Sequence, residues 1–373
     1  MKGFARIVGS GQFFPSTVFE TETLVAMNGL VYSDGPKKGQ SLSGDWAKRY
    51  FGIVTRPLDL VQRDGEWVKL SSEQGGLYGV HMGVLAAREA LTAANIMGRD
   101  IGFVVEASAT HDSIGVGDHI GHYIDALDLA PDTDIFPLPV GCGGFLPALK
   151  QAEASLRSGF SRHALVILQN CPSAQFASKE LRSRYSTAME NIACFLVFSD
   201  GAVAFVLTLD EERGFINSFY QTRLGSDYKL IDVKAGGGFR PAEHHTLADH
   251  AYFMYADKVQ AVFRDICIDN WNIARPWVEA AREQHGPADI GEYVFHQASK
   301  PALLGALRAC PDIPLDKVHF IMETYGNPAV CSGPLVLHHA LTRRNHKPGT
   351  LLPVMLLGAG NGGTLHGAAL YRV

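Results

Sequence analysis

The most informative stretch of the sequence is Pro137–Gly159, PLPVGCGGFLPALKQAEASLRSG. Apolar residues lead into the glycine-rich run Gly141–Gly144, which contains Cys142. Beyond that run, apolar residues recur at the i, i+3, i+4, i+7 spacing of a helix with one buried face: Phe145, Leu146, Leu149, Ala152 and Leu156. We therefore expect Cys142 to lie in a tight turn at a helix N-terminus.

This position favours a nucleophilic thiol at Cys142. The helix dipole and the unpaired N–H groups of the first helical turn stabilise a thiolate and so lower the pKa of a thiol. The neighbouring glycines let another backbone, or a substrate thioester, approach the sulfur. The alternative interpretation is a small buried hydrophobic residue, as most free cysteines are. Other parts of the chain have to decide between the two.

The composition is that of an ordinary globular protein. The chain has 373 residues, of which 46% are hydrophobic and 19% charged, and a formal net charge of −5. Because no basic tract is present, we expect neither nucleic acid nor a membrane as partner. The six cysteines form no CxxC pair, and the start of the chain contains no long apolar run. These features predict a reducing compartment and a cytoplasmic protein.

Strand-like and helix-like patterns alternate along the chain, which predicts an α/β fold with largely buried sheets. The pattern also divides into two halves, 1–209 and 210–373. Each half has a helix after a glycine-containing turn, followed by an apolar strand, which indicates an internal duplication. The expected strands include residues 4–9, 101–106, 163–169, 194–198, 203–209, 292–295, 318–321, 352–357 and 365–373.

Three residues with complementary chemistry share one kind of location, a strand end followed by a helix: Cys142, His296 and Asn327. In α/β sheets the carboxyl ends of strands gather the functional groups. A cysteine with a histidine and an asparagine elsewhere in the chain is the pattern of a nucleophile, a base and an orienting group. His296 stands out among fifteen histidines because it ends the apolar run 293–295 and opens a helix.

Several motifs resemble the β-ketoacyl-acyl-carrier-protein synthase III family. The nucleophile stretch GCGGFLPALKQAEASLRSG is similar to that family's nucleophile helix, and Trp46 with Gly52-Ile53 and Arg56 is similar to its N-terminal motif. The other matches are FSDGAVAFVL at 198–207, HQASKPAL at 296–303, ETYGNPAVCSGP at 323–334 and GNGGTLHGAALYRV at 360–373. They cover nearly the whole chain in family order.

The resemblance implies a thiolase fold, an α-β-α-β-α five-layered sandwich of two similar halves that works as a homodimer. It further implies that Cys142 accepts an acyl group from acyl-CoA or an acyl-carrier protein. His296 and Asn327 would then decarboxylate a malonyl thioester, and the resulting carbanion would attack the acyl group. The backbone N–H groups of Cys142 and Gly362 would form the oxyanion hole. The resemblance implies no cofactor, because the coenzyme A thioester is the substrate, and it implies no metal.

The resemblance also implies substrate contacts and a specialised member. It assigns coenzyme A or substrate binding to Trp46, Arg56, Lys258, Ser299 and Lys300. Ser299 stands where the family commonly has Asn, and Pro301 where it commonly has Arg. Ser113 stands where enzymes for short-chain primers carry a bulky ring, which predicts a larger acyl pocket. The extra length falls in 57–70, 173–190 and 221–247. Together these departures indicate a relative from secondary metabolism.

Alternatives remain at this point. A thiolase-fold acyltransferase would pass the acyl group from Cys142 to a hydroxyl or amine without condensation, and the intact Asn327 favours condensation. A cysteine-based α/β-hydrolase needs Gly where Val140 stands. A non-catalytic subunit would not need Cys142, His296 and Asn327 together. The GxGxxG match at 358–363 precedes a strand rather than a helix, and His119-x-x-His122 lacks further ligands, so neither a dinucleotide nor a metal site is expected.

Overall fold

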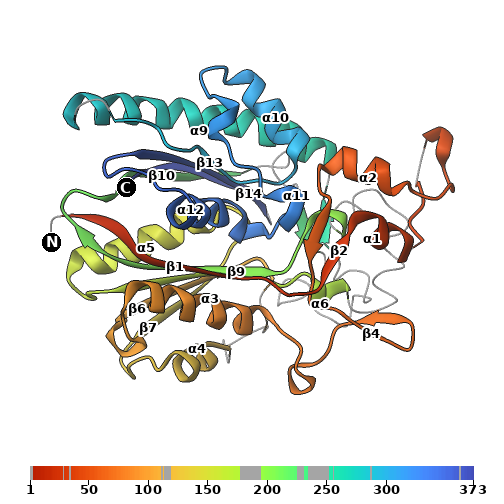
Figure 1. The fold of residues 1–373 in the computed structure, drawn as a ribbon, viewed down its shortest axis with the longest axis horizontal. Helices are drawn as coiled ribbons and strands as arrows, with labels where there is room; N and C mark the ends of the chain where they lie inside the picture. The colour runs from red at the N-terminus through yellow and green to blue at the C-terminus, as the bar shows by residue number, and fades with distance from the viewer. Residues whose placement is uncertain are drawn as a thin grey trace.

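Two β-sheets and three layers of helices stack in the order α-β-α-β-α (Figure 1). The computed structural model describes residues 3–27, 29–32, 35–110, 112, 119–176, 195–224, 231–233, 252–254, 256–285, 288–360 and 363–373. The layering confirms the predicted α/β class and the five-layered sandwich. No helix in these ranges is long and apolar enough to span a membrane.

The first sheet has five strands in the order β1-β9-β8-β6-β7. Strand β6 is parallel to both of its neighbours, whereas β9 is antiparallel to β1 and β8. Helices α3 and α4 cover one face, and α5 packs against the other. The bounds are β1 Phe4–Phe13, α3 Gly79–Ala94, β6 Phe103–Ser108, α4 His119–Leu127, β7 Asp134–Pro139, α5 Phe145–Ser158, β8 Ala164–Asn170 and β9 Gly201–Asp210.

The second sheet has four strands in the order β10-β15-β14-β13, with β13 parallel to β14 and the other pairs antiparallel. Helix α9 covers its outer face with α10 beside it, and α12 lies between the two sheets. The bounds are β10 Gly214–Leu224, α9 Ala256–His285, β13 Val294–Phe295, α10 Lys300–Ala309, α12 Ser332–Arg343, β14 Leu351–Gly360 and β15 Gly363–Arg372. The two sheets therefore use separate stretches of chain, and a domain division at 209/210 stays our proposal.

Short elements gather at one end of the sandwich, on the right of Figure 1. They include two small antiparallel pairs, β2–β3 and β4–β5, and the helices beside them. The remaining bounds are β2 Val18–Glu20, α1 Thr21–Met27, α2 Gly44–Phe51, β3 Thr55–Pro57, β4 Val61–Arg63, β5 Glu66–Val68, α6 Ser173–Phe176, β11 Ile231–Val233, β12 Tyr252–Met254, α11 Met322–Tyr325 and the short 3-10 helix η8 Ala329–Cys331.

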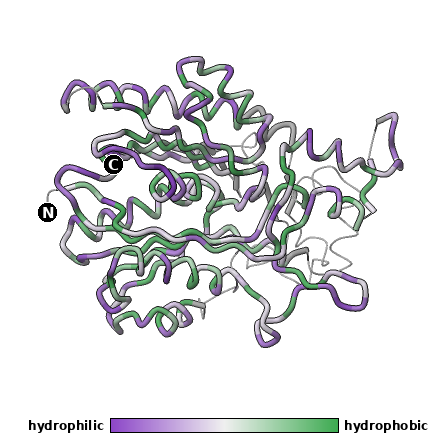
Figure 2. Tube along the Cα trace, viewed as in Figure 1, coloured by the Kyte–Doolittle hydropathy of each residue, from purple (hydrophilic) through white to green (hydrophobic). Residues whose placement is uncertain are grey.

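One cluster of the core fills the middle layer, where α5 and α12 lie between the sheets. Phe145, Leu149 and Leu335 are fully buried there in one cluster with residues of both sheets. Each such side chain contributes about 1.5–3 kcal/mol on burial, which explains why the sequence marks α5 so clearly. Figure 2 shows hydrophobic residues concentrated along the strands and the inner helices.

Two predicted strands are wrong. Residues 195–197 are helical, and only Phe198 forms a bridge, with Asn327. Residues 318–321 form no strand, because a side chain takes the backbone hydrogen bonds that a sheet would need. The Gln297 amide donates to the carbonyl of His319 and accepts from the N–H of Ile321 at 2.8 Å. Apolar periodicity does not reveal such a substitute partner.

Candidate active site

Cys142 lies in the predicted turn directly before α5. The Gly144 N–H donates to the Gly141 carbonyl at 2.9 Å, and the helix begins at Phe145. The glycines are needed for close backbone approach. A Cβ at Gly143 would lie 2.7 Å from the Leu365 carbonyl oxygen, and a Cβ at Gly358 would lie 2.1 Å from the Gly143 nitrogen. The backbones of β14 and β15 therefore lie against the nucleophile turn.

The thiol of Cys142 is not acidic, which corrects the expectation of a lowered pKa. The side chain is only 6% exposed, and burial raises its pKa to about 12 although a backbone hydrogen bond acts in the opposite direction. Desolvation of the anion thus outweighs the helix N-terminus. At neutral pH the resting residue is a thiol, so a base has to take its proton when it attacks.

His296 follows β13 and is fixed by the backbone on both sides. The backbone N–H of His296 donates to the Met355 carbonyl of β14 at 3.0 Å. The backbone N–H of Gln297 donates to the Ser332 hydroxyl at 2.9 Å. Burial lowers the pKa of the imidazole to about 3, so the ring is neutral at physiological pH. The buried Nδ1 has no hydrogen-bond partner among the residues that the structure describes. A neutral imidazole can accept a proton at one nitrogen and donate from the other.

Asn327 is buried between α11 and η8. Its N–H donates to the Val197 carbonyl at 2.9 Å, and its own carbonyl accepts from the Ser199 N–H at 3.1 Å. Its Oδ1 accepts from the Ala329 N–H at 3.0 Å, which fixes the amide orientation and leaves Nδ2 to donate. Ala329 adopts φ +49°, an uncommon conformation of the kind found at functional sites.

One segment, Asn327–Gly333, borders both the nucleophile turn and His296. A Cβ at Gly144 would lie 3.1 Å from Val330 Cγ2, and a Cβ at Gly333 would lie 3.5 Å from the His296 nitrogen. A negative charge on Cys142 would further raise the pKa of Cys331, which also lies in this segment. The segments that carry the three predicted residues therefore lie next to one another. The same hydrophobic cluster contains Cys142, Phe295 and Ala329.

Comparisons with known proteins agree with this arrangement. Residues 136–227 match the family model 3-oxoacyl-[acyl-carrier-protein] synthase III, and residues 280–373 match the model of its C-terminal part. The β-ketoacyl-[acyl-carrier-protein] synthase III of Sphingopyxis alaskensis is 32% identical over 297 residues, which are 78% of this chain and 83% of that protein. The chain belongs to the β-ketoacyl-acyl-carrier-protein synthase III family.

Further members extend the likeness to the whole chain. The protein of the same name from Histophilus somni is 28% identical and covers 99% of both chains. The crystal structure of 3-oxoacyl-(acyl carrier protein) synthase III from Pseudomonas aeruginosa superposes with a TM-score of 0.73 at 20% identity, covering 99% of this chain and 98% of that one. The fold is thus thiolase-like. The chain is a condensing acyltransferase that catalyses a decarboxylative Claisen condensation.

Two of the residues expected at coenzyme A lie on neighbouring helices of this synthase. Trp46 in α2 stacks on Tyr50 with 4.9 Å between ring centroids. Lys300 begins α10, which contacts α2, and its ammonium pairs with Glu323 at 2.7 Å. Ser299 is the N-cap of α10, and its hydroxyl accepts from the Ala302 N–H at 3.3 Å. The Ser299 hydroxyl is therefore already used within the helix.

The expectation that Arg56 contacts coenzyme A is corrected by its burial. The residue is 0% exposed, and its guanidinium donates to the Phe195 carbonyl and the Thr21 hydroxyl inside the protein. Gly362 and Ser113 lie outside the described residues, and so does the side chain of Lys258. Their assignments to the oxyanion hole, the acyl pocket and coenzyme A stay predictions.

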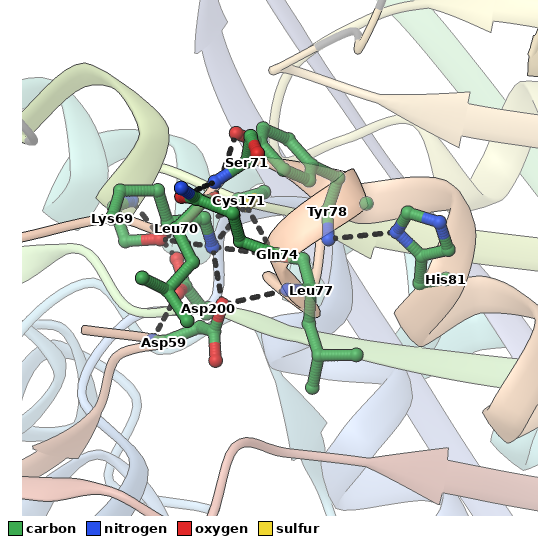
Figure 3. A network of polar contacts seen from close by, with 12 residues as sticks. Asp59, Lys69, Leu70, Ser71, Gln74, Leu77, Tyr78, His81, Cys171 and Asp200 are labelled. Carbon is green, nitrogen blue, oxygen red and sulfur yellow. Dashed lines mark hydrogen bonds and ion pairs between the residues drawn. The ribbon is translucent and has the colours of Figure 1, made fainter. Parts of the chain in front are cut away.

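A buried polar network, which the sequence analysis did not identify, lies beside this site (Figure 3). The Lys69 ammonium contacts the Asp59 carboxylate at 2.9 Å, the Ser173 hydroxyl at 2.9 Å and the Cys171 sulfur at 3.5 Å. Asp200 accepts from the backbone N–H groups of Asp59 and Ser173. Through Asp200, the network joins residues 57–70 to the segment 195–199, whose backbone contacts Asn327. Its sequence signal is limited to Asp200, which lies in the motif FSDGAVAFVL at 198–207.

Proposed function

We propose that this synthase loads an acyl group from coenzyme A, or from an acyl-carrier protein, onto Cys142 and condenses it with a malonyl thioester. The observation that carries the proposal is the combination of a protonated buried thiol with a neutral buried imidazole and an oriented carboxamide. The carboxamide belongs to the segment Asn327–Gly333, which borders both the turn of Cys142 and the backbone of His296. We assign the roles below to these side chains.

Acylation begins with the neutral pair of Cys142 and His296. The thiol pKa lies near 12 and the imidazole pKa near 3, so a separated thiolate and imidazolium would be costly at rest. The sulfur therefore attacks the thioester carbonyl as the imidazole takes its proton. The departing coenzyme A thiolate then recovers that proton. After acylation the imidazole is neutral again and ready to donate.

Decarboxylation follows at the same two polar residues. As the bond between the carboxylate and the α-carbon breaks, the electron pair moves onto the thioester, whose oxygen becomes an enolate. Asn327 Nδ2 and a neutral His296 N–H both donate to that oxygen. The α-carbon then attacks the acyl carbonyl, and Cys142 leaves and regains a proton from solvent. No charged donor is needed, which suits a dry site.

The test separates the two half-reactions. Asn327→Ala should still carry an acyl group on Cys142, detected as added mass, but should release carbon dioxide from malonyl-CoA about a hundredfold more slowly, the usual effect of removing one oxyanion donor. Asn95→Ala offers a control, because Asn95 lies at the end of α3 in the first half of the chain. Unchanged carbon dioxide release in Asn327→Ala would instead show that the Asn327 amide does not stabilise the enolate oxygen.

We also propose a homodimer that packs across strand β7. The strand lies at the sheet edge and carries an apolar run, in which Phe136 is 49% exposed and Pro137 and Pro139 are exposed. Asp134 and Val140 donate their backbone N–H groups towards β6. The backbone N–H positions of the odd-numbered residues therefore point away from β6, to the open edge of the sheet. The prolines therefore stand where a partner strand would need donors. We expect such a dimer to rest on side-chain packing.

A cytoplasmic location and a larger acyl pocket complete the proposal. The five described cysteines are free and buried, which suits a reducing compartment. The small side chain of Ser113 supports acyl groups longer than acetyl. An acyl-carrier protein as partner follows from the family of the chain.

A further inference from the structure

The short segment Val54–Arg56 runs beside the chain that leads into Asn327. The Val54 N–H donates to the Glu323 carbonyl at 2.9 Å. The Thr55 hydroxyl donates to the Thr324 carbonyl at 2.9 Å. Arg56 then contacts Gly326, since a Cβ at that glycine would lie 3.1 Å from Arg56 Cβ. The three consecutive residues 54–56 thus run alongside residues 323–326, which end directly before Asn327.

Arg56 also reaches the opposite side of the Asn327 loop. Its Nη1 donates to the Phe195 carbonyl at 3.3 Å, and its Nη2 donates to the Thr21 hydroxyl at 3.0 Å. Phe195 begins the segment 195–199, which supplies both backbone partners of Asn327. The guanidinium therefore connects Thr21 in the N-terminal region to the segment 195–199, while Arg56 Cβ lies against Gly326 on the other side of the loop.

The guanidinium of Arg56 is an unusual group to keep in this place. It is wholly buried, and within the described part of the chain its Nε has no hydrogen-bond partner and no acidic side chain pairs with it. An unpaired buried charge costs several kcal/mol. Its planar guanidinium can donate hydrogen bonds in two directions, which an apolar side chain of similar size cannot do.

Gly326 shows how tightly the loop is held. Its backbone adopts φ +65° and ψ −151°, a conformation essentially restricted to glycine. A Cβ there would meet Arg56 Cβ at 3.1 Å, the Val197 carbonyl oxygen at 3.2 Å and Ser199 Cβ at 3.4 Å. The position of Asn327 is thus determined by contacts from Arg56 on one side and from 197–199 on the other.

We propose that Arg56 is a positioning residue for Asn327, holding its carboxamide where the enolate oxygen forms, and that Thr55 assists through α11. The proposal rests on the role given to Asn327 above. We therefore expect Arg56 to affect decarboxylation and not acylation, because the described contacts of the nucleophile turn around Cys142 do not involve residues 54–56.

The test uses Arg56→Lys and, as a milder change, Thr55→Val. Lysine keeps the charge but loses the planar guanidinium, so the Asn327 loop relaxes. Because a displacement of about 1 Å can cost a hundredfold in rate, we expect carbon dioxide release to fall about 10- to 100-fold in Arg56→Lys. Acylation of Cys142 should stay within about threefold, since the described contacts of the nucleophile turn do not involve residues 54–56. Thr133→Val is the matched control, because Thr133 also donates to a carbonyl, that of Ile101, at 2.9 Å.

The decisive readout is a double-mutant cycle. If Arg56 acts through Asn327, then Arg56→Lys should slow carbon dioxide release in the wild-type background but have no further effect in Asn327→Ala. Equal slowing in both backgrounds, or an equal loss of acylation, would overturn the positioning role. If Asn327→Ala alone left carbon dioxide release unchanged, the proposed function would fail instead. Should Arg56→Lys not fold, the same cycle with Thr55→Val decides.

Discussion

Gly358→Ala should impair the nucleophile turn without touching a reactive side chain. The new Cβ would lie 2.1 Å from the Gly143 nitrogen and 2.8 Å from the Cys142 nitrogen. Ordinary contact begins near 3.4 Å, so β14 and the turn have to separate by about 1.3 Å. Because both sides are backbone, no flexible side chain can absorb this change. A shift of about 1 Å in a reacting group costs about a hundredfold, so we expect acylation of Cys142 to slow by about that factor.

The assay is the rate of mass gain on Cys142 with acyl-CoA in excess, together with thermal unfolding. Gly121→Ala is the matched control, because Gly121 lies in α4 and a Cβ added there would meet no described atom outside its own helix within 4 Å. That change should leave acylation unaltered and stabilise the helix by about 0.5–1 kcal/mol. Acylation at the wild-type rate in a folded Gly358→Ala protein would refute the account of how the turn is packed.

Three other results are expected. The free energy of unfolding should fall by about 2–3 kcal/mol for each unit by which the pH is lowered near pH 5.5, because unfolding takes up about two protons there. Glu292, with a pKa raised to about 7 by burial, binds its proton in the folded state and offsets part of the uptake. The uptake comes from three histidines whose pKa burial lowers to about 3, 4 and 3: His296, His338 and His339. A flat urea-unfolding free energy from pH 7 to 5 would contradict this. Replacing Pro137 and Pro139 by valine should restore two outward donors and tighten the dimer in analytical ultracentrifugation, whereas a monomer in both proteins would exclude packing across β7. Octanoyl-CoA should acylate Cys142 faster than acetyl-CoA in competition, and the reverse preference would refute the pocket inferred from Ser113.

Much of the site was visible in the sequence because it depends on local patterns. Periodic apolar residues and a glycine run fix Cys142 before α5, and a short apolar strand fixes the location of His296, whereas Asn327 follows helix α11 and not the strand expected before it. These positions are defined by the local backbone, and an α/β fold brings such positions together. The motifs of the family follow the same three places in order.

The errors arose where tertiary contacts outweigh local rules. The helix N-terminus at Cys142 predicts an acidic thiol, but burial raises its pKa to about 12. Arg56 follows a surface-like stretch, yet it is wholly buried. The strand expected at 318–321 is absent because Gln297 supplies the hydrogen bonds of that backbone. Burial and side-chain substitutes of this kind depend on residues far away in the chain, which no window of sequence contains.

The central claim is that one thiol carries the acyl group and that its release is coupled to decarboxylation. The most direct measurement is a single turnover of the acylated protein with malonyl-CoA labelled in its free carboxylate, followed by peptide mass and by labelled carbon dioxide. We predict one acyl group on the peptide containing Cys142, lost in step with one equivalent each of carbon dioxide and condensed product. An acyl group on another residue, or its loss to a hydroxyl or amine without carbon dioxide, would contradict the account.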